Sequence, residues 1–162
     1  MSTTVAVISD THLTGSSKRD LPAAVWTEIE AADLVLHAGD VTSPDLLERI
    51  GAVTPVVAVL GNNDVGLDAL PERWTDVIEG VRVAMVHDSG PTKGRARRMA
   101  RWFPDADVVV FGHSHAPVWE EGVEGQWLLN PGSPTQRRRQ PTHSMARLTL
   151  RDGTAEAEIL EV

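Results

Sequence analysis

One stretch constrains the fold more than any other: residues 108–115, which read Val-Val-Val-Phe-Gly-His-Ser-His. Four apolar residues in a row fit a short strand that is buried on both faces, and the run stops at Gly112. His113 and His115 then lie two positions apart in a segment that favours neither helix nor strand. Imidazoles so spaced at a strand end are suited to metal binding. Taken alone, the stretch fits a solvated, idle His-Ser-His turn equally well.

Four other apolar runs end in polar residues of metal-ligand type. The endings are Asp10-Thr11-His12, Gly39-Asp40, Gly61-Asn62-Asn63-Asp64 and His87-Asp88. In α/β sheets, sites gather beyond the carboxyl ends of the strands, so the five endings converge if their strands lie side by side. No single ending is specific, because an Asp or Asn after a strand is commonly a cap or turn residue. Together they predict a site rich in Asp, Asn and His, which suits Mn, Fe, Ni or Zn.

The remaining pattern predicts helices that alternate with buried strands early in the chain, and mostly strands later. Strands are expected over residues 4–9, 33–38, 55–60, 76–79, 81–86, 108–111, 117–121, 126–129, 144–150 and 155–161. Helices are expected over 21–32, 44–50 and 93–102, with Ser43 as the N-cap of the second. The last four strands should form two hairpins. We therefore expect mixed sheets with helices outside, in one domain spanning 1–162.

Composition narrows the function classes. The net charge of −8 over 162 residues argues against a broad nucleic-acid-binding surface, although a locally positive site can still bind a small phosphate ester. The chain has no cysteine, so any metal must be held by His, Asp, Glu, Asn or backbone oxygen, which suits a cytoplasmic protein. No apolar run approaches the ~20 residues that a membrane span needs, and residues 1–10 do not resemble a signal peptide.

The order of these motifs resembles the calcineurin-like metallophosphoesterases, and most of all their small bacterial and archaeal phosphodiesterase branch, which is related to the retromer subunit. The family pattern D-x-H, G-D, G-N-x-D, H and G-H-x-H is matched in order across residues 5–133. The turn Asn130-Pro131-Gly132-Ser133 is also typical of this branch. The resemblance implies an α/β (α+β) fold in which two facing mixed β-sheets form a β-sandwich flanked by helices.

The resemblance also implies a site for two divalent ions, with manganese expected first and nickel, iron or zinc as alternatives. The ligands implied for one ion are Asp10, His12, Asp40 and His115. Those implied for the other are the bridging Asp40, with Asn62, His87 and His113. Such a centre hydrolyses phosphoesters by direct attack of a metal-bridging hydroxide on phosphorus, so no phospho-enzyme is expected.

Asn63 and Asp64 are the expected catalytic residues beside the ligands. Many family members carry His at the position of Asn63, and Asn can donate a hydrogen bond but no proton at neutral pH. Rates should therefore depend steeply on leaving-group acidity. Asp64 is expected to support a ligand histidine through a hydrogen bond. Asp88 stands where Gly is more common, and it either disfavours highly anionic monoesters or is a solvated loop residue.

The expected function is hydrolysis of small phosphodiesters. A non-catalytic interaction scaffold of the retromer-subunit kind is the main alternative, and every ligand-type position being filled favours the enzyme. A nuclease is a third possibility, against which the acidic charge weighs. Membrane partners are not expected, and a homo-oligomer remains open, with the hairpin of Trp119 and Trp127 as its candidate interface. Specificity should lie in loops 14–20, 64–72 and 88–95.

Three further groups have simpler expected roles. The arginines of the 93–102 helix should form a solvated face, and residues 137–139 should do the same. His37, two positions before Gly39, is expected to be a buried strand histidine rather than a partner of a metal ligand.

Overall fold

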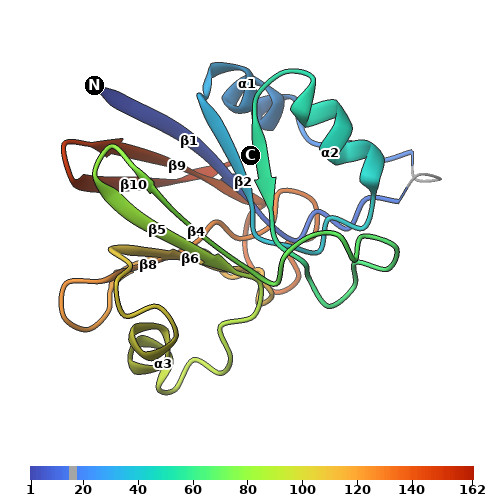
Figure 1. Ribbon diagram of the computed structural model, residues 1–162. Helices are drawn as coiled ribbons and strands as arrows, with labels where there is room; N and C mark the ends of the chain where they lie inside the picture. Colours follow the sequence, from blue (N-terminus) through green and yellow to red (C-terminus); the bar gives the residue numbers. More distant parts are fainter. Residues whose placement is uncertain (15–17) are drawn as a thin grey trace.

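The computed structural model describes residues 1–14 and 18–162, in which ten strands form two five-stranded mixed sheets (Figure 1). Sheet A has the order β10-β9-β1-β2-β3. Its strands are β1 (Ser2–Ile8), β2 (Leu34–His37), β3 (Val56–Ala58), β9 (Ser144–Arg151) and β10 (Thr154–Glu161). Sheet B has the order β4-β5-β6-β8-β7. Its strands are β4 (Arg73–Ile78), β5 (Val81–Val86), β6 (Val108–Val110), β7 (Val118–Glu121) and β8 (Trp127–Asn130).

The two sheets face each other, and helices cover their outer sides (Figure 1). Helices α1 (Ala23–Ala31) and α2 (Pro44–Gly51) pack on sheet A through Val25, Ile29, Leu46 and Ile50. Helix α3 (Arg95–Trp102) packs on sheet B through Met99. This arrangement confirms the sandwich that the resemblance implied. No helix in the described part of the chain is long and apolar enough to span a membrane.

The central strands are apolar throughout because both of their faces are buried. In β1, Val5 and Val7 pack between the sheets, whereas Ala6 and Ile8 pack under the helices of sheet A. In β6, Val108 and Val110 pack between the sheets, and Val109 packs toward α3. Alternate residues therefore serve two separate cores, which explains why these runs show no polar alternation.

Most predicted elements are confirmed within two residues at each end. The pairs β7–β8 and β9–β10 are antiparallel hairpins, as expected. Strand β4 begins at Arg73, three residues before the predicted start, because its residues are largely exposed and lack an apolar pattern. Ser43 occupies the N-cap position of α2, but its side chain makes no capping hydrogen bond. Backbone conformation and Pro44 therefore define the start of this helix.

Candidate metal centre

The five polar endings converge at one end of the sandwich. They come from both sheets, because β1, β2 and β3 are parallel neighbours in sheet A while β5 and β6 are parallel neighbours in sheet B. Backbone hydrogen bonds join the endings: the Asp10 N–H donates to the Gly39 carbonyl at 2.9 Å, and the Gly112 N–H donates to the His87 carbonyl at 2.9 Å. The predicted convergence is confirmed, although two facing sheet ends supply it instead of one.

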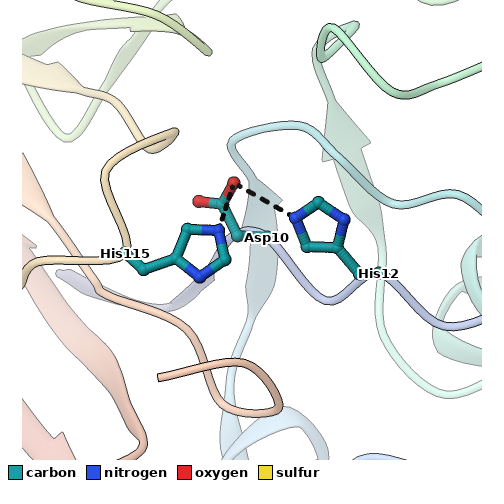
Figure 2. Close-up of side chains that lie close together, drawn as sticks. All are labelled: Asp10, His12 and His115. Carbon is teal, nitrogen blue, oxygen red and sulfur yellow. Dashed lines mark ion pairs between the residues drawn. The ribbon is translucent and has the colours of Figure 1, made fainter. Parts of the chain in front are cut away.

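The first group consists of Asp10, His12 and His115 (Figure 2). The Asp10 carboxylate lies between the two imidazoles, with its Oδ1 atom 3.8 Å from His12 Nε2 and 3.5 Å from His115 Nε2. All three atoms are buried and lack a hydrogen-bond partner. Unpaired buried polar atoms are rare because they lose their hydration without compensation. A divalent cation would satisfy all three atoms, so this donor set fits a metal.

The second group is built around Asp40. Its Oδ2 atom lies 3.4 Å from His12 Nε2 and 3.4 Å from His87 Nε2, so Asp40 stands between the two halves of the site. Asn62 Oδ1 is 3.0 Å from His87 Nε2 and 3.3 Å from His113 Nδ1. The structure thus brings all seven predicted ligands together. Asp10 Oδ1 also approaches His87 Nε2 to 3.8 Å, which links the two groups directly.

Five of these residues have the left-handed backbone conformation that non-glycine residues rarely adopt. Their φ angles are 56° for Asp10, 47° for His12, 55° for Asp40, 72° for His113 and 61° for His115. Each such residue costs on the order of 1–3 kcal/mol of strain, and such strain clusters at functional sites. No pattern in the amino-acid sequence indicates this backbone strain.

The close approach of the ends of β1 and β6 explains why residue 112 is a glycine. A Cβ atom on Gly112 would lie 2.0 Å from Ser9 Oγ and 2.8 Å from Asp10 Oδ2. Any larger residue would therefore push the end of β6 away from the end of β1 and separate His113 and His115 from Asp10.

Hydrogen bonds to the atoms that face away from the centre orient the ligand side chains. The Nδ1 atom of His87 faces the Ala38 carbonyl at 2.7 Å, and Nδ1 of His115 faces the Gln136 carbonyl. A carbonyl can only accept, so Nδ1 of each ring carries a proton, and in the neutral imidazole Nε2 is then the nitrogen whose lone pair can bind a metal. Asp10 Oδ2 accepts from Ser9 Oγ at 2.7 Å and from the His113 N–H at 2.9 Å. Its Oδ1 is thereby left for a metal.

The carboxylates of the centre are ionised. Burial acts to raise the pKa of Asp40, but the neighbouring His87 and the hydrogen bonds donated by Asn63 outweigh it and hold that pKa well below its usual range. Asp10 behaves in the same way, since His12, His87 and Ser9 lower its pKa against the effect of burial. Burial also lowers the pKa of His115, which favours the neutral imidazole that binds metals.

Asn63 and Asp64 contact the centre differently from each other. Asn63 donates its backbone N–H to Asp40 Oδ1 at 2.9 Å and its side-chain amide to Asp40 Oδ2 at 2.8 Å. The prediction that Asp64 forms a hydrogen bond with a ligand histidine is wrong. Asp64 instead accepts the backbone N–H groups of Asp40, Gly61 and Thr42, at 3.0, 2.8 and 2.7 Å. Because these donors fill its carboxylate, Asp64 fixes the loops that follow β2 and β3.

The Asn130–Ser133 turn and the segment after it support the site in a way that the sequence did not reveal. Ser133 Oγ donates to the Asp10 carbonyl at 2.8 Å, and Thr135 Oγ1 donates to the Thr11 carbonyl at 2.6 Å. Arg138, expected to be solvated, is exposed but places Nη1 3.4 Å from the His113 carbonyl. Hydroxyl groups that bind backbone a hundred residues away leave no local signal in a sequence.

The arginines of α3 do not form a uniformly solvated face. Arg97 and Arg101 are exposed, but Arg95 is buried and donates from Nε to Ser89 Oγ at 2.9 Å. Arg98 donates from Nε to the Ser89 carbonyl at 2.7 Å. The expectation was wrong for this pair because the start of α3 turns toward the loop that follows His87.

The remaining expectations have mixed outcomes. His37 is a buried strand histidine, as expected: its Nδ1 accepts the Gly39 N–H at 3.2 Å and its Nε2 lies 3.0 Å from Thr11 Oγ1. Asp88 is exposed, with Oδ2 3.9 Å from His113 Nε2, so it lies at the mouth of the centre. Residues 15–17 of the expected specificity loop 14–20 lie outside the described residues.

Known proteins resemble this chain in sequence. The family model of the calcineurin-like phosphoesterase superfamily domain matches residues 3–153. A probable metallophosphoesterase of Methanothermobacter thermautotrophicus is 38% identical over 138 residues, which cover 83% of this chain and 78% of that protein.

Solved structures share the fold at lower sequence identity. Vacuolar protein sorting 29 from Cryptosporidium parvum superposes with a TM-score of 0.79 at 22% identity, covering 99% of this chain and 98% of its own. A structure described as a novel archaeal phosphodiesterase has a TM-score of 0.71 at 20% identity, covering 97% and 99%. Through the family match over residues 3–153 and the 38% identical relative, the chain belongs to the calcineurin-like phosphoesterase superfamily, whose members bind divalent metals.

Proposed function

We propose that the chain is a metal-dependent phosphodiesterase that hydrolyses small phosphodiesters at a centre of two divalent ions, manganese first among them. The observation that carries this proposal is the set of three buried, unpaired ligand atoms on Asp10, His12 and His115. Asp40 lies directly beside this set, 3.4 Å from both His12 and His87, and can serve as the shared ligand.

The residues divide the work as follows. One ion would be held by Asp10, His12, Asp40 and His115. The other ion would be held by Asp40, Asn62, His87 and His113. When bound, the two ions would lower the pKa of water, polarise the phosphoryl oxygens and, at about +4 against the −2 of Asp10 and Asp40, attract phosphate to an acidic chain. Asn63 keeps Asp40 oriented through two hydrogen bonds.

Two side chains bear on which phosphate esters the site would hydrolyse. Asp88 lies 3.9 Å from His113 at the mouth and would repel the second negative charge of a monoester dianion. Asn63 cannot supply a proton to a departing alkoxide, so esters of acidic alcohols are favoured. The structural neighbour described as an archaeal phosphodiesterase supports the proposal only to the extent that the same fold accommodates such a site.

Turnover of bis(p-nitrophenyl) phosphate tests this proposal. The purified chain with added Mn²⁺ should release p-nitrophenolate. The rate should be at least about 100-fold lower in the Asp40→Asn variant, because an amide binds the two ions more weakly than the shared carboxylate does. Circular dichroism shows whether the variant still folds. If the wild-type chain binds Mn²⁺, Ni²⁺, Fe²⁺ or Zn²⁺ but hydrolyses no phosphodiester, the proposal is wrong.

An interaction scaffold is the second candidate, favoured by the similarity to vacuolar protein sorting 29. The half-buried pair of Trp119 and Trp127, stacked at 4.7 Å on the β7–β8 hairpin, is its candidate contact. Metal binding without turnover would favour the scaffold, whereas turnover that vanishes in Asp40→Asn would favour the enzyme.

A further inference from the structure

His37 is a buried histidine that is not among the proposed metal ligands. It ends β2 with none of its surface exposed, and both of its ring nitrogens have a polar partner. Its Nδ1 accepts the Gly39 N–H at 3.2 Å, and its Nε2 lies 3.0 Å from Thr11 Oγ1. Thr11 stands between two proposed ligands in the chain, and Gly39 directly precedes Asp40. The imidazole therefore connects the two segments that carry three of the ligands.

The hydrogen bonds around His37 run in one direction. The Gly39 N–H can only donate, so Nδ1 of His37 is the unprotonated nitrogen. Burial lowers the pKa of His37 to about 4, so at neutral pH the ring is uncharged and its proton lies on Nε2. The Nε2–H group then donates to Thr11 Oγ1, which in turn donates to the Val41 carbonyl at 3.3 Å. The two ligand histidines whose Nδ1 faces a carbonyl have the opposite tautomer.

The two segments that His37 connects have a backbone conformation that needs support. Four of their residues have left-handed φ angles: Asp10 at 56°, His12 at 47°, Asp40 at 55° and Thr42 at 60°. Such conformations persist only where the surrounding structure over-determines them. The backbone hydrogen bond from the Asp10 N–H to the Gly39 carbonyl gives part of this support. His37 adds a side-chain link between the same segments, and its partner Thr11 is also fully buried.

Packing alone does not require a histidine at position 37. The preceding strand residues Val35 and Leu36 are apolar and fully buried. The Gly39 N–H is different, because it is buried and, among the described residues, donates to no acceptor other than His37. An apolar side chain would leave this N–H without a partner one residue before Asp40, which is unfavourable. An imidazole offers one acceptor and one donor on a rigid ring, as the two segments require.

We propose that His37 is a positioning residue, which fixes the backbone that carries Asp10, His12 and Asp40 without being a ligand itself. The inference rests on the metal centre of the proposed function and adds a residue that acts on that same site. Loss of the link should leave every ligand side chain present but allow the two segments to relax from their left-handed conformations. Residues that orient ligands from outside typically change metal affinity roughly 10–100-fold.

The Mn²⁺ affinity of three variants tests the proposal. His37→Leu removes both hydrogen bonds, whereas His37→Gln can keep the donor to Thr11 and His37→Asn the acceptor for Gly39. Isothermal titration calorimetry should give Mn²⁺ dissociation constants at least about tenfold higher for His37→Leu than for the wild-type chain. The Gln and Asn variants should bind Mn²⁺ more tightly than His37→Leu. The matched control His143→Leu, at a half-buried histidine that is not a proposed ligand, should keep the wild-type dissociation constants.

A second background shows whether the effect passes through Thr11. Thr11→Val removes the partner of Nε2, so in this background His37→Gln should bind Mn²⁺ no more tightly than His37→Leu. A packing effect would leave the advantage of glutamine unchanged. Circular dichroism shows which variants fold. Should none of them fold, ¹⁵N NMR of the wild-type chain loaded with Zn²⁺ locates the proton of His37: a proton on Nε2 supports the proposal, and a proton on Nδ1 overturns it.

The outcomes separate this proposal from the proposed function. Wild-type Mn²⁺ affinity in folded His37→Leu overturns the positioning role and leaves the phosphodiesterase standing. Equal weakening in all three variants of His37 also overturns it, because the loss then follows from packing. The expected order of affinities in a chain that hydrolyses no phosphodiester supports the positioning role and overturns the phosphodiesterase. A wild-type chain that binds no Mn²⁺ overturns both.

Discussion

Asn63 is the residue at which this chain departs most informatively from its family. Its amide group is committed to Asp40, at 2.8 Å, and carries no proton that it can give up at neutral pH. Hydrolysis should therefore depend on how well the leaving group departs unaided. We expect a steep fall in kcat as the leaving-group pKa rises across a series of aryl and alkyl phosphodiesters.

The Asn63→His variant tests this dependence. An imidazole at the same position can act as a general acid, a contribution of about 10²–10⁴-fold where geometry allows. The rate for alkyl esters should rise at least about tenfold relative to aryl esters. The control Asn63→Ala should lower all rates without flattening their dependence on leaving-group pKa. An unchanged dependence in Asn63→His would show that proton donation does not limit the reaction.

The lowered pKa of His37 leads to a prediction about how stability depends on pH. Burial lowers its pKa from 6.5 to about 4, so between these pH values the unfolded chain binds more protons than the folded chain. The stabilisation from neutral His37 is therefore present above about pH 6.5 and is lost as the pH falls toward 4, on the order of 3 kcal/mol in all.

Urea unfolding in EDTA at several pH values between 4 and 7 measures this effect. The free energy of unfolding should fall with decreasing pH more steeply for the wild-type chain than for His37→Gln, in which the side chain at position 37 does not titrate. Equal slopes for the two proteins would contradict the assignment of a lowered pKa to His37.

At the scale of elements, the loops after β2 and β3 depend on Asp64. Its carboxylate accepts N–H groups from both loops, at 2.7–3.0 Å. Asp64→Asn replaces one acceptor oxygen with an N–H₂ group that faces a backbone donor. We expect a loss of about 1–3 kcal/mol in the free energy of unfolding of the metal-free chain, measured in urea by circular dichroism. The exposed Asp105→Asn serves as control and should leave it within about 0.5 kcal/mol.

The elements could be predicted where packing leaves a pattern in the sequence. Strands such as β1 and β6 are apolar on both faces because each serves two cores, and they were placed within two residues. The start of β4 was missed because Arg73 and Thr75 are exposed and show no apolar pattern. Arg95 was misjudged as solvated because only the fold places Ser89 against its guanidinium.

At the scale of the whole molecule, the motifs indicated which residues meet but not how. Five strand ends could have met along one sheet, and it was the family resemblance that implied two. Parallel pairing of β6 with β8, and the reach of Ser133 to the Asp10 carbonyl, join segments far apart in the chain and leave no periodic signal. The role of Asp64 could not be predicted for the same reason, since its donors lie in two different loops.

The central claim is that two ions are held by two distinct groups that share Asp40, and counting bound metal tests it most directly. After loading with Mn²⁺ and removal of free metal, elemental analysis should find two ions per wild-type chain. His115→Ala should lose mainly the ion beside Asp10 and His12, and His113→Ala mainly the ion beside Asn62 and His87, so each variant should retain one. A wild-type chain that binds a single ion, or variants that each lose both ions or none, would contradict the account.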